Sequence, residues 1–256
     1  MRKTLQFVRL AALLLLPATA ANAQVSAETM GKVLPVEIFV CKYNDGQGPA
    51  DLDKVVARWT RYMDEQENRD YAAWTLTPYF YGAEQDFDLI WMGAYTDGNA
   101  WGAGTDNWLA NGGALQAEFA KLATCDTHVA LSSAMYKAPP DGTPASGVIT
   151  MMACELNEGH TYKDIRAAEL KWVEHLEAQQ SPVGYWHWFP LFGGGNAEFD
   201  YKIVSAYRNF SEVGAEFERN ANGGGREIAR EIFADIDECD EPRVYLAKNR
   251  RAAPLR

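Results

Sequence analysis

The chemically most versatile side chain of the sequence lies in an aromatic run, Tyr185-Trp-His-Trp-Phe189. An imidazole titrates near neutral pH, so His187 could act as a general acid or base on a bound molecule. Alternation along a strand would place His187 on one face together with Tyr185 and Phe189. The alternative is a hydrogen-bonded structural histidine, and the sequence does not decide which face of the sheet it occupies.

One acid and a second group of aromatic residues could complete a pocket. Glu37 lies in an apolar stretch typical of a strand and could share acid–base work with His187, although an exposed or edge position is the alternative. Aromatic walls with a few polar groups suit a small-molecule pocket. The residues expected to line it, besides Tyr185 and Phe189, are Tyr79, Tyr81, Trp91 and Tyr95.

Several established motifs are absent from the sequence. There is no G-x-S-x-G elbow, no H-E-x-x-H motif and no Walker loop. The four histidines, at positions 128, 160, 175 and 187, show no spacing typical of metal ligands. We therefore predict no metal site and identify no cofactor, and haem or metal ligation by one of them is the alternative.

The elements that would position these residues occur twice. The four cysteines form two pairs separated by 84 and 85 positions, Cys41 with Cys125 and Cys154 with Cys239. When Cys41 is placed over Cys154, many other residues match after small shifts in loops. The matching pairs include Trp59 with Trp172, Trp74 with Trp186, Pro78 with Pro190, Phe87 with Phe199 and Tyr95 with Tyr207. The sequence therefore predicts an internal duplication.

Each copy is expected to contain a strand, a helix, two strands, a helix and a final strand. In the first copy the second helix is predicted over 108–122, and in the second copy a helix begins at Thr161 with a capping pattern. Three prolines and one glycine in 138–146 indicate a linker. The predicted boundaries are 24–138 for the first repeat, 139–146 for the linker and 147–256 for the second repeat.

This order of elements resembles the ferredoxin-like fold, and two fused units resemble the dimeric α+β-barrel superfamily. The predicted fold class is therefore α+β, with two βαββαβ units forming one barrel within the chain. The resemblance rests on element order and not on a diagnostic motif. It implies that the first and last strands of each unit are neighbours, which would pair Cys41 with Cys125 and Cys154 with Cys239 as disulfides. The alternative pairs Cys41 with Cys154 and Cys125 with Cys239, near the axis that relates the two repeats.

The first 23 residues have the layout of a secretory signal peptide, with three basic residues, a short apolar run and Ala21-Asn-Ala23. The remaining 233 residues carry a net charge of −14, against −11 for the whole chain. That balance disfavours nucleic acid as a partner. We therefore expect a periplasmic or secreted protein that has no membrane span and is a monomer or weak homodimer.

Three classes of function are compatible with these features. The first is an exported protein that binds a small molecule in an aromatic cavity between the two repeats. The second is an enzyme that uses His187 and Glu37, and the resemblance implies monooxygenase-like or acid–base chemistry. The third is an envelope interaction protein that uses the Trp- and Gly-rich segment 91–113 as an exposed loop.

Overall fold

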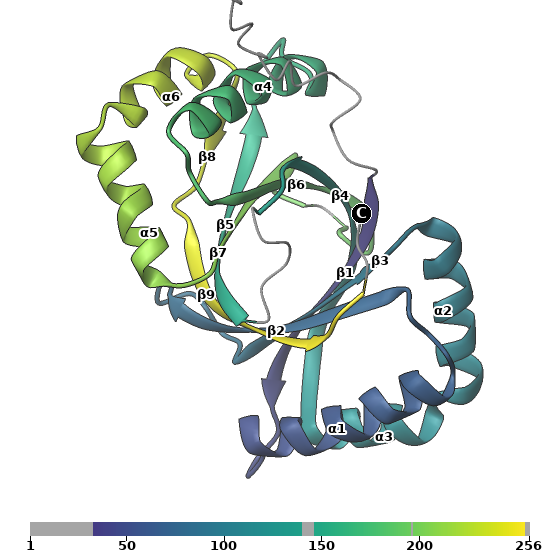
Figure 1. Ribbon diagram of the computed structural model, residues 1–256. Coiled ribbons are helices and arrows are strands. Elements are labelled where there is room, and N and C mark those ends of the chain that lie inside the picture. Colours follow the sequence, from purple (N-terminus) through teal and green to yellow (C-terminus); the bar gives the residue numbers. More distant parts are fainter. Residues whose placement is uncertain (1–32, 140–145, 196, 254–256) are drawn as a thin grey trace, which may run out of the picture.

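The computed structural model describes residues 33–139, 146–195 and 197–253. Eight antiparallel strands form a closed barrel in the order β1-β3-β2-β9-β5-β7-β6-β4, with β4 pairing back to β1 (Figure 1). A ninth strand, β8 (Asp237–Cys239), pairs with β5 outside the barrel. The barrel strands are β1 (Leu34–Tyr43), β2 (Tyr71–Phe80), β3 (Leu89–Tyr95), β4 (Ala123–Lys137), β5 (Ser146–Leu156), β6 (Gly184–Phe192), β7 (Tyr201–Tyr207) and β9 (Arg243–Arg251).

The two halves of the chain contribute strands in the same order. Residues 33–139 supply β4-β1-β3-β2, and residues 146–253 supply β9-β5-β7-β6. The halves meet at two seams, where β2 pairs with β9 and β4 pairs with β6. Each half therefore depends on the other to satisfy the backbone groups along its outer strands.

The helices cover the barrel in two layers on opposite sides (Figure 1). The first layer holds α1 (Pro49–Glu65), α2 (Gly98–Asn111) and α3 (Gly113–Leu122). The second holds α4 (Tyr162–Ala178), α5 (Phe210–Phe217), a π-helical turn η1 (Glu218–Asn222) and α6 (Gly225–Phe233). The predicted start of α4 is confirmed, because Thr161 and Asp164 form a capping box.

Strand alternation separates an inner core from two outer cores. Trp74, Trp188 and Met92 belong to the core that fills the barrel. Trp186 packs against the same inner core, so the side chains between these tryptophans point the other way, toward the helices. His187 therefore faces the layer of α4 and not the barrel interior. The two outer cores lie under the two helix layers.

Both disulfides have the predicted connectivity. Cys41 is bonded to Cys125, and Cys154 is bonded to Cys239. The first bridge joins the paired strands β1 and β4, and the second joins β5 to the short β8. Each closes a loop of more than eighty residues, for which the chain-entropy relation gives a stabilisation of about 4.5 kcal/mol.

Two predictions about the first half need correction. The helix predicted over 108–122 is two helices, α2 and α3, that meet at Gly112, where a Cβ would lie 2.6 Å from the carbonyl oxygen of Trp108. The segment 91–113 is not an exposed loop, because β3 and α2 occupy most of it. Trp101 and Trp108 are half-buried against the outer core of the first half, which weakens their proposed role as a contact surface.

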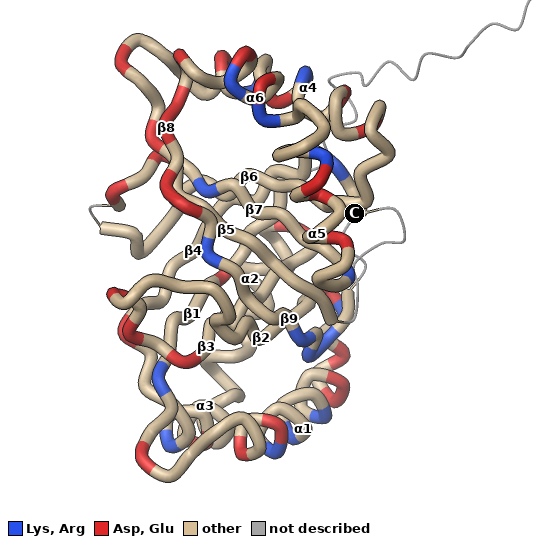
Figure 2. Tube along the Cα trace, turned by 90° about the vertical axis from the view of Figure 1, so that its left-hand side faces the viewer, with Lys and Arg blue, Asp and Glu red and all other residues tan. Residues whose placement is uncertain are grey.

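The predicted signal peptide, residues 1–23, and most of the linker lie outside the described residues. Within the described part, no helix has the length and apolar character needed to cross a membrane. Figure 2 shows acidic residues, in red, spread over the helices and loops of both halves, as the net charge leads one to expect.

Candidate functional site

The most unusual polar cluster of the described residues lies between β6 and α4. Glu169 projects from α4 and His187 from β6, and both side chains are 0% exposed. Glu169 occupies a position in the stripe of α4 that is otherwise apolar, with Ile165, Val173 and Leu176. Burying a carboxylate here is costly unless it is hydrogen-bonded or paired, so the cluster requires a specific arrangement.

Glu169 accepts two hydrogen bonds through one oxygen. His187 Nε2 lies 2.8 Å from Glu169 Oε1, and the Tyr185 hydroxyl donates to the same oxygen at 3.0 Å. Among the described residues, neither Glu169 Oε2 nor His187 Nδ1 has a hydrogen-bond partner, although each exposes less than 1 Å². One polar atom of each side chain is therefore buried without a hydrogen-bond partner. Burying such atoms destabilises the fold.

Aromatic rings enclose the imidazole. Tyr201 stacks on His187, with ring centroids 4.6 Å apart and planes at 25°, and Tyr136 lies 4.5 Å away on a tilted plane. Phe189 adds a third contact at 6.0 Å. Tyr136 comes from the last strand of the first half, where a bulge in the pairing of β4 with β6 lies at this residue. The centre is therefore built from both halves of the chain.

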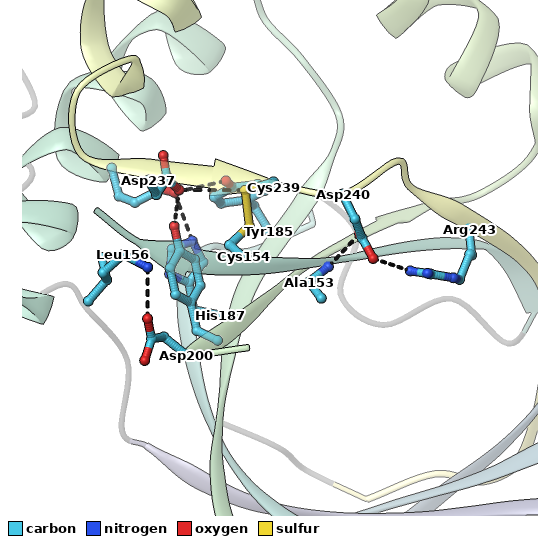
Figure 3. The surroundings of a disulfide bond; sticks show 12 residues. Ala153, Cys154, Leu156, Tyr185, His187, Asp200, Asp237, Cys239, Asp240 and Arg243 are labelled. Carbon is cyan, nitrogen blue, oxygen red and sulfur yellow. Dashed lines mark hydrogen bonds and ion pairs between the residues drawn. A yellow bond between two sulfur atoms is a disulfide. The ribbon is translucent and has the colours of Figure 1, made fainter. Parts of the chain in front are cut away.

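A second carboxylate approaches from the edge of the centre. Tyr201 donates its hydroxyl hydrogen to Asp237 Oδ2, and Asp237 belongs to β8, next to the disulfide (Figure 3). The sulfur atom of Cys239 lies 3.5 Å from the same carboxylate oxygen. Because both cysteines are oxidised, the nearby sulfur atoms and carboxylate do not constitute a metal site in this state.

The electrostatics of the centre keep its tyrosines protonated. Burial raises the pKa of the Tyr185 hydroxyl well above its usual value, and the nearby Glu169 raises it further. Burial and the contact with Asp237 raise the pKa of the Tyr201 hydroxyl. Burial and the nearby Glu169 raise the pKa of the Tyr136 hydroxyl. Burial also raises the pKa of the Asp237 carboxyl. The centre is thus a set of neutral hydroxyl donors around carboxylates.

The corresponding place in the first half lacks this chemistry. The register of the strands fixes the comparison, because Cys41 pairs with Leu89 as Cys154 pairs with Tyr201. The residues equivalent to Glu169, His187, Tyr185 and Tyr201 are Val56, Thr75, Ala73 and Leu89. Thr75 accepts a hydrogen bond from Arg250 Nε at 2.8 Å instead. The acid–base pair is therefore a property of the second half.

The structure does not bring Glu37 and His187 together. Glu37 projects from β1 toward the helices of the first half, where Trp101 Nε1 donates to its carboxylate at 2.8 Å. Trp91 and Tyr95 lie in the outer core of that half, and Trp91 Nε1 donates to the Tyr71 hydroxyl at 3.0 Å. Glu37 thus belongs to a separate polar and aromatic cluster.

The remaining predicted lining residues are also dispersed. Tyr79 and Tyr81 are 48% and 59% exposed at and just beyond the end of β2, whereas Tyr185 and Phe189 lie in the outer core of the second half. None of the predicted lining residues belongs to the core inside the barrel. The residues that sequence reasoning missed are Glu169, Tyr136, Tyr201 and Asp237. Only Glu169 carried a recognisable sign, an acid in the apolar stripe of a helix.

Comparisons with known proteins identify the fold. No family model matches the chain, and no curated protein matches its sequence. A solved structure from Fusobacterium nucleatum, provisionally described as a monooxygenase, has a TM-score of 0.55 at 10% identity, covering 86% of this chain and 94% of its own. A mutant chlorite dismutase from Candidatus Nitrospira defluvii has a TM-score of 0.51 at 8% identity, with coverages of 87% and 95%. A haem-binding protein from Thermus thermophilus has a TM-score of 0.50 at 12% identity, with coverages of 86% and 92%.

These likenesses extend over most of each compared chain and show the architecture. The chain has the fold of the dimeric α+β-barrel proteins, as the order of elements in the sequence predicts. At such low identity the likeness shows the fold alone, and function must be argued from the site.

Proposed function

We propose that this protein binds a small single-ring aromatic molecule in the second half and that the Glu169–His187 pair transfers a proton to or from it. The observation that carries the proposal is the pair of buried, unpartnered atoms, Glu169 Oε2 and His187 Nδ1. A fold that holds two such atoms gives up stability, which is typical of functional sites.

The chemistry of the pair suits proton transfer. A carboxylate that accepts a hydrogen bond from one nitrogen orients the imidazole and stabilises its charged form, leaving the other nitrogen available to a ligand. Tyr185 donates to the same carboxylate and fixes its orientation. Glu169 is the partner of His187 in this proposal, and Glu37, which the sequence suggested, has no part in it.

The size of the ligand is argued from the ring that now covers the imidazole. Tyr201 places a phenol ring in stacking contact with His187. A molecule that displaces this ring can occupy a space of about one phenol and gain the same stacking, which contributes about 0.5–1.5 kcal/mol beyond burial. A phenol or a related single-ring molecule is therefore the favoured ligand class.

Haem does not fit this centre as it is packed. A histidine with one nitrogen on a carboxylate and the other unpartnered has the donor arrangement of many metal ligands. However, His187 and Glu169 are completely enclosed, and Tyr201 and Tyr136 contact the imidazole. A macrocycle several rings wide would require the displacement of more than one of these side chains. No step of the proposed function passes through haem.

The binding test uses p-cresol, which is the side chain of tyrosine as a free molecule. Because His187 is completely enclosed while the Cys154–Cys239 bond is intact, the calorimetric titration is run with a phosphine reductant. The chain should bind p-cresol there, and His187→Phe and Glu169→Gln should each weaken binding at least tenfold. Thr75→Val, at the matching place of the first half, should leave the affinity unchanged. No binding to the wild type at millimolar p-cresol, or equal losses in all three variants, would reject the proposal.

We also propose that the two halves are copies of one ferredoxin-like βαββαβ unit and that the chain is exported. The shared strand order supports the first statement, and the two disulfides support the second, because such bonds persist in oxidising compartments. The mass of the protein recovered from a periplasmic extract tests export. A chain that begins at Gln24 is expected, and an intact Met1 would contradict cleavage.

A further inference from the structure

We propose that β8 (Asp237–Cys239) is a lid over the Glu169–His187 centre and that the Cys154–Cys239 disulfide locks this lid closed. The inference rests on the proposed function in one respect, namely that a ligand must reach an imidazole that is 0% exposed. β8 lies at the edge of the sheet, outside the closed barrel, and is the segment that carries the disulfide (Figure 3).

A continuous set of contacts leads from the disulfide to the centre. Cys239 Sγ lies 3.5 Å from Asp237 Oδ2, and that oxygen accepts the hydrogen bond from Tyr201. Tyr201 in turn stacks on His187, which bonds to Glu169. The position of β8 therefore decides whether the Tyr201 ring stays over the imidazole.

Few noncovalent contacts hold β8 in place. Its three residues pair with three residues of β5. On one flank Asn157 N donates to the Ile236 carbonyl at 2.9 Å; on the other, Ala153 N donates to Asp240 Oδ1 at 2.7 Å and Asp240 N donates to the Ala153 carbonyl at 2.9 Å. A strand this short at a sheet edge opens more readily than the barrel strands. The disulfide is the covalent part of this attachment. A phosphine reductant attacks one sulfur atom and breaks the S–S bond. Water then supplies the oxygen of the phosphine oxide and the two protons, which leaves two thiols and an unlocked lid.

The first half provides a built-in contrast. Its disulfide joins Cys41 in β1 to Cys125 in the fifteen-residue β4, so the strand ladder holds the cysteines without help. The residue that corresponds to Asp237 is Ala123, which cannot accept a hydrogen bond through its side chain. The two bridges close loops of 84 and 85 residues, so their removal should loosen the unfolded chain equally. Any difference between the two disulfide variants at the Glu169–His187 centre must then arise from the local structure of β8.

The test measures how fast diethyl pyrocarbonate modifies each histidine, read as mass added to its peptide. In the oxidised wild type, His187 should react at least tenfold more slowly than the exposed His128. In Cys154→Ala/Cys239→Ala, the rate at His187 should rise at least tenfold, while the rate at His128 stays the same. In Cys41→Ala/Cys125→Ala, the rate at His187 should stay at the wild-type value.

A third variant guards against a folding failure. Asp237→Ala keeps the disulfide but removes the acceptor for Tyr201, so it should also speed modification of His187. Equal acceleration in both cysteine variants, or none in Cys154→Ala/Cys239→Ala and Asp237→Ala, would overturn the lid. The p-cresol titration is independent of this result. If His187 modification depends on the disulfide but p-cresol does not bind, the proposed function is rejected and the lid is retained. If p-cresol binds but His187 modification does not depend on the disulfide, the lid is rejected and the proposed function is retained.

Discussion

Replacing the buried pair by its first-half equivalents should separate stability from function. Glu169→Val alone leaves His187 Nε2 and the Tyr185 hydroxyl without their shared acceptor. His187→Thr alone leaves a buried carboxylate with one donor. Leaving a buried polar group without its hydrogen-bond partner costs about 1–3 kcal/mol, and more when the group is charged. Each single variant should therefore be strongly destabilised.

The double variant Glu169→Val/His187→Thr should be less destabilised than either single variant. Replacing both members of a buried pair by apolar or small residues is often neutral or stabilising, although the smaller side chains leave a cavity that offsets part of the gain. The coupling free energy between the two positions should be about 2–3 kcal/mol. Adding Tyr185→Phe removes the tyrosine hydroxyl that has lost its acceptor and should recover further stability.

Urea unfolding of the oxidised chain, followed by tryptophan fluorescence, measures this coupling. The matched cycle in the first half, Val56→Ala with Thr75→Ala, should be additive within about 0.5 kcal/mol because these side chains share no hydrogen bond. Additive losses at Glu169 and His187 would refute the reasoning, because they would mean that the pair has no special energetic relation. A stable double variant that no longer binds p-cresol is the expected result.

Two further predictions concern the packing of the first half and the ionisation of the tyrosines. Gly93→Ala should destabilise the protein by about 1–3 kcal/mol, because the new Cβ would lie 1.9 Å from the Tyr71 hydroxyl oxygen. Gly102→Ala in α2, where a Cβ meets nothing within 4 Å, should instead stabilise it by up to about 1 kcal/mol. Urea unfolding of both variants checks the two signs. Burial raises the pKa of six tyrosines above the value of an unfolded tyrosine, namely Tyr71, Tyr95, Tyr136, Tyr185, Tyr201 and Tyr207. Above about pH 10 the folded state therefore binds more protons than the unfolded state, and the free energy of unfolding falls as the pH rises further. A tyrosinate absorbance titration should show these six ionising together with the loss of circular dichroism, and their reversible ionisation in a folded protein would contradict the burial argument.

Much of the scaffold could be predicted from the sequence because its signs are local. Apolar alternation defined the strands, the Thr161 and Asp164 spacing defined a helix start, and the resemblance to the ferredoxin-like fold implied the bridges. The helix predicted over 108–122 was wrong in extent because tertiary packing overrides local propensity there. Gly98, Gly102 and Gly104 disfavour a helix by propensity, yet packing on the sheet stabilises α2 there.

The candidate site was predictable only in part, because its residues come from separate segments. Alternation correctly grouped His187 with Tyr185 and Phe189, but alternation cannot say which face of a sheet becomes the barrel interior. The position of Tyr136 depends on a bulge where β4 meets β6, and that of Asp237 on a three-residue strand. Neither feature has a sequence pattern of its own.

The contrast between the halves is itself an argument about function. Both halves have the same strand order, a disulfide at the same register and a tryptophan at the same place on the first helix, so the scaffold does not require Glu169, His187 or Tyr201. The first half fills the matching positions with Val56, Thr75 and Leu89 and leaves no acid–base pair there. A buried carboxylate with an unpartnered oxygen costs stability that the first half avoids. Its presence in the second half alone supports the proposal that a ligand uses those atoms.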